Sequence, residues 1–278
     1  MEKVAIIRLS FFLGIFLVMA LWEIIAPRRK KTTSKAIRWT WNLGLTILNP
    51  LVVRLLFPVL AVAIAIKARE QGWGLLNLYD LPDWVSFILS IILLDMVVYL
   101  QHLMFHAVPL LWRLHMVHHA DLDYDVTTGL RFHPIEIIIS MLIKMSTVAV
   151  LGPPVSAVVA FEVILNGMAM FNHGNVHLPA GIDRLLRWIV VTPDMHRVHH
   201  SVIPNETNSN FGAVFPIWDI LFGTFRTSTR QPHESMELGL EGVPEERTTA
   251  LRWLLTSPFQ PSDNKTSSTL SRPTVSTL

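Results

Sequence analysis

The sequence predicts an all-α integral membrane protein, a helical bundle of about four to five spans, from three observations. Apolar residues make up 51% of the 278-residue chain and charged residues only 16%, with a mean hydropathy of +0.43, which is too apolar for an ordinary soluble domain. The apolar residues gather in stretches long enough to cross a bilayer. Eleven of the twelve histidines lie between His102 and His200, which indicates a polar site beside the membrane.

The first apolar run covers residues 4–26. At a rise of about 1.5 Å per residue it is long enough for a hydrocarbon layer of about 30 Å, and Arg8 can reach the interface near one end. A cleavable signal peptide is the alternative. No small-residue cleavage site follows, however, because the chain continues directly into the basic residues 28–31. We therefore expect a membrane span here.

Two further apolar runs follow. The run at about 43–66 is interrupted by the Asn49-Pro50 pair and by Arg54, so it is predicted to be kinked or not simply transmembrane. The run at about 84–101 is continuous and carries one carboxylate, Asp95. A carboxylate inside a span is costly. Two roles stay open for it, pairing near the histidine site and a structural hydrogen bond.

Residues 135–171 are predicted to form an apolar hairpin. Its arms, Ile135–Leu151 and Val155–Phe171, are each about 17 residues long, the lower limit for a span, and Gly152-Pro153-Pro154 breaks the helix between them. Lys144 and Glu162 each place a charge inside an arm. The hairpin is therefore expected either to cross the bilayer or to dip into it without crossing fully.

Basic residues orient the bundle. The loop 28–38 holds six Lys and Arg residues, which places it in the cytoplasm, whereas the loop at about 67–83 mixes basic and acidic residues and suits the outside. By the parity of the spans, the chain after about residue 171 lies inside, so all the clustered histidines fall on the cytoplasmic side. The Ser-, Thr- and Pro-rich tail from Pro258 is predicted to be disordered.

Composition excludes several kinds of site. The chain contains no cysteine, which removes disulfides, zinc–cysteine sites, iron–sulfur clusters and thiolate-ligated haem. The formal net charge of +2 gives no basic field that would attract nucleic acid. No G-x-G-x-x-G follows a strand pattern, so no recognisable nicotinamide site is present. A metal in this chain would be held by nitrogen or oxygen.

Ten histidines fall into four groups with helical spacing. The groups are two H-x3-H pairs, His102/His106 and His173/His177, and two H-x2-H-H triplets, His115/His118/His119 and His196/His199/His200. Positions i, i+3 and i+4 share a helix face within an arc of about 100°, so each group is expected to aim its imidazoles one way. A lone histidine is more often a hydrogen-bonded core residue, but ten neighbouring imidazoles buried without a metal would need many polar partners. Ten ligands are too many for one metal and suit two, with about five nitrogens each.

Ligand type alone does not choose the metal, because imidazole binds zinc, copper, iron and nickel alike. The histidine groups abut membrane spans, where a lipid chain is the accessible substrate, and oxidation of an unactivated C–H bond favours iron with O2. Two other classes compete. A zinc hydrolase is disfavoured because the chain has no H-E-x-x-H and too many histidines for a three-ligand zinc. A non-catalytic metal-binding or metal-transport protein is disfavoured because the histidines lie beyond the span ends.

The four histidine groups and the residues around them resemble the fatty acid hydroxylase/sterol desaturase superfamily. The further matches are Arg113-Leu114, Arg131-Phe132-His133-Pro134-Ile135-Glu136, Val191-Thr192-Pro193-Asp194-Met195, Asn210-Phe211-Gly212 and Trp218-Asp219-Ile220-Leu221-Phe222-Gly223-Thr224. The resemblance covers about residues 86–226, half of the chain. It implies a membrane core of four helices and a cytosolic helical cap that holds a dimetal centre.

The resemblance also implies an O2-dependent lipid hydroxylase or desaturase, an oxidoreductase with two iron ions, for which zinc is a possible substitute. Electrons would come from a separate donor such as a ferredoxin, or cytochrome b5 with its reductase. Whether the product is an alcohol or an alkene stays open, as does the lipid. The implied metal ligands, which are also the catalytic residues, are His102, His106, His115, His118, His119, His173, His177, His196, His199 and His200.

The resulting domain organisation is an N-terminal membrane region at 1–85, a catalytic domain at 86–228 and a cytosolic C-terminal segment at 229–278. Two residues of the R-F-H-P-I-E stretch are further candidates. His133 is expected to support a ligand or bind a metal weakly, against the alternative of a loop histidine bonded to backbone. Glu136 is expected either to orient a ligand imidazole or to cap the following helix. The aspartates at 121, 123 and 125 are expected to form a solvated loop.

Overall fold

The computed structural model describes residues 2–57 and 60–260, and throughout these ranges the regular structure is helical. The only β-type pairings there are two isolated bridges, Pro27 with Val176 and Ser201 with Leu238. The long helices are α1 (Glu2–Ile25), α2 (Lys35–Leu56), α3 (Ala61–Gln71), α4 (Asp83–Ala107), α5 (Pro109–His119), α6 (Pro134–Leu151) and α7 (Val155–Asn172). The all-α prediction is confirmed.

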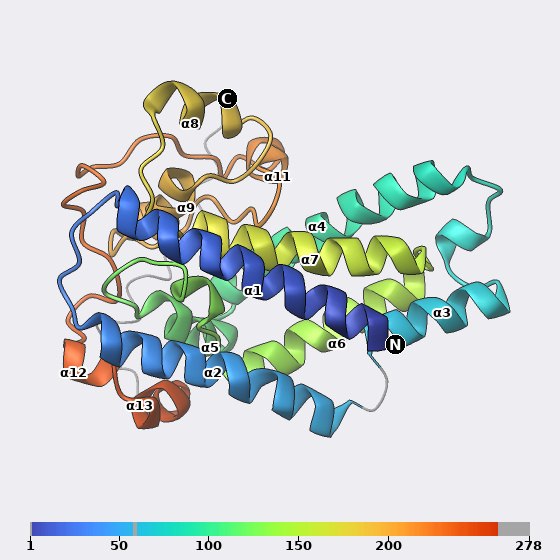
Figure 1. Ribbon diagram of the computed structural model, residues 1–278, viewed down its shortest axis with the longest axis horizontal. Helices are drawn as coiled ribbons and strands as arrows, with labels where there is room; N and C mark the ends of the chain where they lie inside the picture. The colour runs from blue at the N-terminus through green and yellow to red at the C-terminus, as the bar shows by residue number, and fades with distance from the viewer. Residues whose placement is uncertain (1, 58–59, 261–278) are drawn as a thin grey trace.

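Short helices follow α7 and form a cap. They are α8 (Ala180–Leu186), α9 (Pro193–His199), α10 (Pro204–Thr207), α11 (Ile217–Leu221), α12 (Glu245–Thr248) and α13 (Leu251–Thr256), followed by the 3-10 turn η3 (Ser257–Phe259). Two further 3-10 turns occur earlier in the chain, η1 (Leu75–Asn77) before α4 and η2 (Thr128–Leu130) before α6. Figure 1 shows the cap gathered at the end of the bundle where α1 ends and α2 begins, with the N-terminus towards the opposite end.

Four helices are long and apolar enough to cross a membrane: α1, α4, α6 and α7. A fifth candidate span is the pair formed by α2 and the segment Ala61–Asn77, which are bent by 40° relative to each other. Most apolar side chains of α1 are at least partly exposed, since only 6% of its most apolar stretch is buried inside the protein. Exposed apolar surface of this extent indicates contact with lipid, and the predicted range of four to five spans is confirmed.

Proline and glycine set the sharp turns between the long helices. Gly152 ends α6 in the left-handed conformation, at φ 62°, and donates its N–H to the carbonyl of Val148, before Pro154 precedes the first turn of α7. Val108 alone separates α4 from α5, because Pro109 forces the preceding residue out of the helical region. The turn at Val108 folds the histidines of α5 back onto the last turns of α4.

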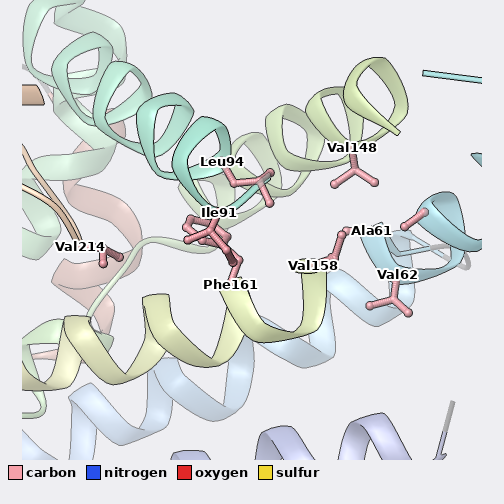
Figure 2. Close-up of a cluster of buried hydrophobic side chains, with 9 residues drawn as sticks. Ala61, Val62, Ile91, Leu94, Val148, Val158, Phe161 and Val214 are labelled. Atoms are coloured by element: carbon pink, nitrogen blue, oxygen red, sulfur yellow. The ribbon is translucent and has the colours of Figure 1, made fainter. Parts of the chain in front are cut away.

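An apolar core holds the membrane helices together. Figure 2 shows Ile91 and Leu94 of α4, Val148 of α6, Val158 and Phe161 of α7, and Ala61 and Val62 of α3 converging with Val214 of the cap. Each of these side chains is buried. The presence of Val214 in this cluster means that part of the cap packs against the bundle itself.

The two charges within the hairpin form an ion-paired group. The Lys144 Nζ lies 3.4 Å from the Glu162 carboxylate, and the Arg8 guanidinium approaches the other carboxylate oxygen at 2.6 Å. The predicted hairpin thus forms as α6 and α7, and its internal carboxylate is neutralised by two cations. Pairing of this kind lowers the cost of placing these residues within an apolar span.

The aspartates at 121, 123 and 125 are buried, so the prediction of a solvated loop is wrong. Arg38 of α2 binds Asp121 through Nε at 2.6 Å and Asp125 through Nη1 at 2.9 Å, while the backbone N–H and hydroxyl groups of Thr32 and Thr33 donate to Asp123. Burial alone would raise the pKa of Asp121, but the neighbouring Arg38 outweighs it and holds that pKa below the usual value. Alternating aspartates in a sequence are typical of an exposed loop. Here the fold places Arg38 against them, and this pairing allows them to be buried.

The basic loop between α1 and α2 lies against the cap. Arg28 pairs with Asp194 at 3.1 Å, and the Arg29 N–H donates to the side chain of Asn175 at 3.0 Å. The basic loop and the histidines therefore lie at the same end of the bundle, as the parity of the spans predicted.

The C-terminal part also belongs to the cap. Leu254 of α13 is buried against Leu45 of α2 and Val117 of α5. The tail predicted to be disordered from Pro258 falls largely on residues 261–278, which lie outside the described residues, whereas Pro258 itself is buried within η3.

Candidate metal centre

Four short stretches of chain bring the histidines together. His102 and His106 occupy the last turns of α4, and the first triplet occupies the last turns of α5. His173 caps the C-terminus of α7. The second triplet lies on α9 and its C-cap residue, His200; Pro193 begins this helix and Thr192 caps it by accepting the Met195 N–H. Every group stands at a helix end next to the bundle, so the site forms where the membrane helices meet the cap.

Nine of the ten predicted ligands form two groups, and within each group one ligand atom of every histidine lies within 4.8 Å of the others. We call them cluster 1 and cluster 2. Cluster 1 consists of His102, His106, His115, His119 and His199, and cluster 2 of His118, His173, His196 and His200. The clusters adjoin, because the ring of His119 in cluster 1 stacks on that of His200 in cluster 2 at 4.5 Å, and the rings of His199 and His196 stack at 5.0 Å.

Each triplet is divided between the clusters. In α5, His115 and His119 serve cluster 1 and His118 serves cluster 2; in the second triplet, His196 and His200 serve cluster 2 and His199 serves cluster 1. The i and i+4 side chains thus go to one cluster and the i+3 side chain to the other. A shared helix face does not mean a shared metal, and the expectation of five nitrogens for each metal becomes five and four.

Most of the ring Nδ1 atoms form hydrogen bonds on the side of the imidazole that faces away from its cluster. Those of His102, His173 and His199 donate to the backbone carbonyls of Phe211, Ala169 and Ser209 at 2.7–2.8 Å. The Nδ1 of His118 donates to the Arg131 carbonyl at 3.2 Å, and that of His115 to the Glu136 carboxylate at 2.7 Å. A carbonyl only accepts, so these rings carry their proton on Nδ1. Outer hydrogen bonds of this kind orient metal-bound histidines.

The inner Nε2 atoms then fit a cation. His102 and His115 bring their Nε2 atoms to 3.1 Å from each other, as do His118 and His173. Because the proton of each ring sits on Nδ1, both nitrogens of such a pair present lone pairs, and neither can donate to the other. Facing lone pairs at this distance repel unless a positive charge lies between them. The nitrogen-only donor set suits iron, zinc, copper or nickel.

Burial keeps the imidazoles neutral. It lowers the pKa of His173 and of His199 to about 3, with the nearby histidines adding to the effect, and it holds the pKa of His118, His119, His196 and His200 well below 6.5. A neutral imidazole is the form that binds a metal. Only His102 is partly exposed among the nine.

The structure does not bring His177 to either cluster. Its side chain is exposed, and its backbone N–H donates to the Ala26 carbonyl beside the bridge between Pro27 and Val176. The cause is the end of α7 at Asn172. Beyond this residue the chain is not helical, so the i+4 relation that would align His177 with His173 is lost.

The two further candidates, Glu136 and His133, have different positions relative to the clusters. Glu136 contacts His115 directly, and it also lies in the first turn of α6. His133 lies outside the clusters: its Nδ1 accepts the N–H of Ile135 at 3.1 Å and its Nε2 donates to the Leu255 carbonyl, so it caps α6 and holds α13. Asp95 makes structural hydrogen bonds, accepting the backbone N–H groups of Val214 and Phe215.

No sequence pattern marks the backbone carbonyls that orient the ligands. Phe211, Ala169 and Ser209 act through the backbone, which every residue possesses, so side-chain chemistry cannot single them out. Only the family resemblance distinguishes the Asn210-Phe211-Gly212 stretch. The structure supplies the reason, because the Phe211 carbonyl faces His102 and the Asn210 amide ties Met195 to Arg226.

Comparison with known proteins identifies related chains. Residues 87–224 match the model of the fatty acid hydroxylase family. The chain is 32% identical over 201 residues to the alkylglycerol monooxygenase of Xenopus tropicalis, covering 68% of this chain and 43% of the relative. It is 30% identical over 162 residues to the ornithine lipid hydroxylase OlsE of Rhizobium tropici, covering 58% and 47%.

The human alkylglycerol monooxygenase shows 32% identity over 166 residues, covering 57% of this chain and 35% of the relative. The chain thus spans less than half the length of each of these three curated relatives. No solved structure was found to match it.

Proposed function

Because this chain belongs to the fatty acid hydroxylase/sterol desaturase superfamily, we propose that it is a membrane-bound di-iron oxygenase that hydroxylates or desaturates a lipid. The observation that carries the proposal is the pair of adjoining histidine clusters with unprotonated Nε2 atoms facing inward. The nine clustered histidines are the proposed metal ligands, and His177 is not among them. Residues 86–228 are the proposed catalytic domain.

Iron is the proposed metal, with zinc as a possible substitute, because apolar spans at the site favour a lipid substrate. Two irons with O2 and added electrons would supply the oxidising power that an unactivated C–H bond requires. The chain supplies the surroundings. Carbonyls and Glu136 hold the imidazoles in one tautomer and one orientation, and eight of the nine clustered histidines are buried.

We propose a lipid with an ether-linked chain or an amino-acid headgroup as the first substrate class to test. The support is that one set of relatives is named for alkylglycerols and another for ornithine lipids. The electrons are proposed to come from a separate carrier such as a ferredoxin, or cytochrome b5 with its reductase.

The function is tested by O2 uptake in the purified, iron-loaded protein with a chemical or protein reductant. Consumption of O2 that depends on an added alkylglycerol or ornithine lipid, with a hydroxylated or desaturated product by mass spectrometry, is the expected result. Iron-loaded protein that takes up no O2 with either lipid class or with a sterol and a fatty acyl lipid would favour the metal-binding or metal-transport alternative.

The cap is proposed to lie in the cytoplasm. The basic loop at 28–38 is at the cap end of the bundle, which the positive-inside rule assigns to the cytoplasm. Because the chain has no cysteine, single cysteines report topology directly. A cysteine at the exposed Glu241 should react with a membrane-impermeant reagent only after the cytoplasmic side is opened, and one at the exposed Gln71 in intact cells or vesicles. The reverse pattern would contradict this orientation.

A further inference from the structure

Part of the cap lies alongside a membrane span rather than beyond its end. This part is residues 211–224, which we call the α11 loop because it contains α11. The Trp218 Nε1 donates to Asp95 at 2.9 Å, the Tyr99 and Thr224 hydroxyls lie 2.9 Å apart, and the ring of Phe222 stacks on that of Tyr99 at 5.5 Å. Asp95 and Tyr99 precede the end of α4 at Ala107 by a distance of about 12–18 Å, at about 1.5 Å per residue.

The outer surface of the α11 loop is apolar. Ile217, Ile220, Leu221 and Phe222 are 43%, 38%, 64% and 47% exposed. On α4 itself, Leu100 and Ile92 are exposed at the same level of the helix. Large exposed apolar side chains on both elements are costly in water and ordinary in contact with acyl chains. The α11 loop thus packs on a candidate span and exposes apolar side chains as that span does.

The backbone of the α11 loop is irregular, which in hydrocarbon requires every N–H to find an internal partner. Two fully buried carboxylates provide partners for four of these N–H groups. Asp95 accepts the N–H groups of Val214 and Phe215 at 3.2 Å, and Asp219 accepts those of Phe211 and Gly212 at 2.8 Å. A carboxylate within α4, otherwise unexpected in a span, is thus explained by the backbone that it satisfies.

We propose that the α11 loop is embedded in the cap-side leaflet of the bilayer, with Ile217, Ile220, Leu221 and Phe222 against acyl chains. This placement does not depend on the reaction. It has a consequence for the metal centre, because the carbonyl of Phe211 in the same loop accepts the Nδ1–H of His102. The element that orients a ligand of cluster 1 is then held by the membrane.

Site-directed fluorescence tests the placement in the full-length protein. A bimane probe on Leu221→Cys, in phosphatidylcholine vesicles, is compared with probes on Ile88→Cys and Glu241→Cys. Ile88 is an exposed residue of the α4 span and serves as the lipid-facing reference. Glu241 is an exposed residue of the cap and serves as the water-facing reference. Each probe is quenched either by lipids with brominated acyl chains or by aqueous iodide.

The expected result is that brominated chains quench the Leu221 and Ile88 probes alike and that iodide quenches both several-fold less than the Glu241 probe. A Leu221 probe that iodide quenches as strongly as the Glu241 probe, with no effect of brominated lipid, would overturn the proposal. Ile217→Cys provides a second site that should report the same environment, so failure of one variant to fold leaves the comparison intact.

Discussion

Replacement of His173 by alanine is expected to deplete cluster 2 of metal and abolish lipid oxidation, whereas His177→Ala is expected to leave metal content and turnover close to those of the parent protein. His173 is buried with its Nε2 3.1 Å from that of His118 and 3.2 Å from that of His200, while His177 is exposed and outside both clusters. Removal of a ligand should cost more than the roughly 10- to 100-fold in metal affinity or activity that loss of an outer hydrogen bond costs.

The measurement is metal per chain together with product formation for both variants. His233→Ala is a further control, because His233 is half-buried beside Asp194 and belongs to neither cluster. Loss of metal from His177→Ala equal to that from His173→Ala would mean that the chain after α7 folds back over the clusters, contrary to the structure. Equal loss from His233→Ala would show that the assay reports folding rather than ligation.

Replacement of Arg38 by methionine is expected to unfold the cap end of the protein. Arg38 is 1% exposed and is the cation paired with both Asp121 and Asp125, which are themselves buried. Removal of one partner of a buried ion pair leaves an uncompensated charge and costs about 3–5 kcal/mol. The affected loop follows His119 directly, so metal content should fall together with stability.

Thermal unfolding in detergent is the measurement, with Arg252→Met as a matched control, since Arg252 is an exposed arginine of α13. The control is expected to stay within about 0.5 kcal/mol of the parent. A stable, metal-loaded Arg38→Met protein would contradict the role assigned to Arg38, and would mean that Lys31 beside Asp125 and Arg131 beside Asp121 neutralise the aspartates without it.

The sequence predicted the helical bundle well because the signals were local. Apolar runs of sufficient length and a Gly152-Pro153-Pro154 break correspond closely to α6 and α7, and the histidine groups mark the helix ends that carry the metal site. The parity of the spans also placed the basic loop and the histidines at one end of the bundle. These features depend on residues close together in the chain.

Features that depend on distant residues could not be predicted. The division of each triplet between two clusters follows from how α5 and α9 pack against each other and α4. Residue spacing along one helix does not determine it. The aspartates after His119 appeared solvated because their partner, Arg38, lies about 80 residues earlier. The H-x3-H spacing predicts that His177 joins His173 only if the helix continues, whereas α7 ends at Asn172.

Elemental analysis shows whether the nine clustered histidines bind two metal ions in adjoining sites. The sample is the full-length protein, purified without chelator and reconstituted anaerobically with ferrous iron. We expect about two metal ions per chain, iron in active protein with zinc as the substitute after overexpression. A folded protein that holds no metal, or only one ion per chain under these conditions, would contradict this expectation.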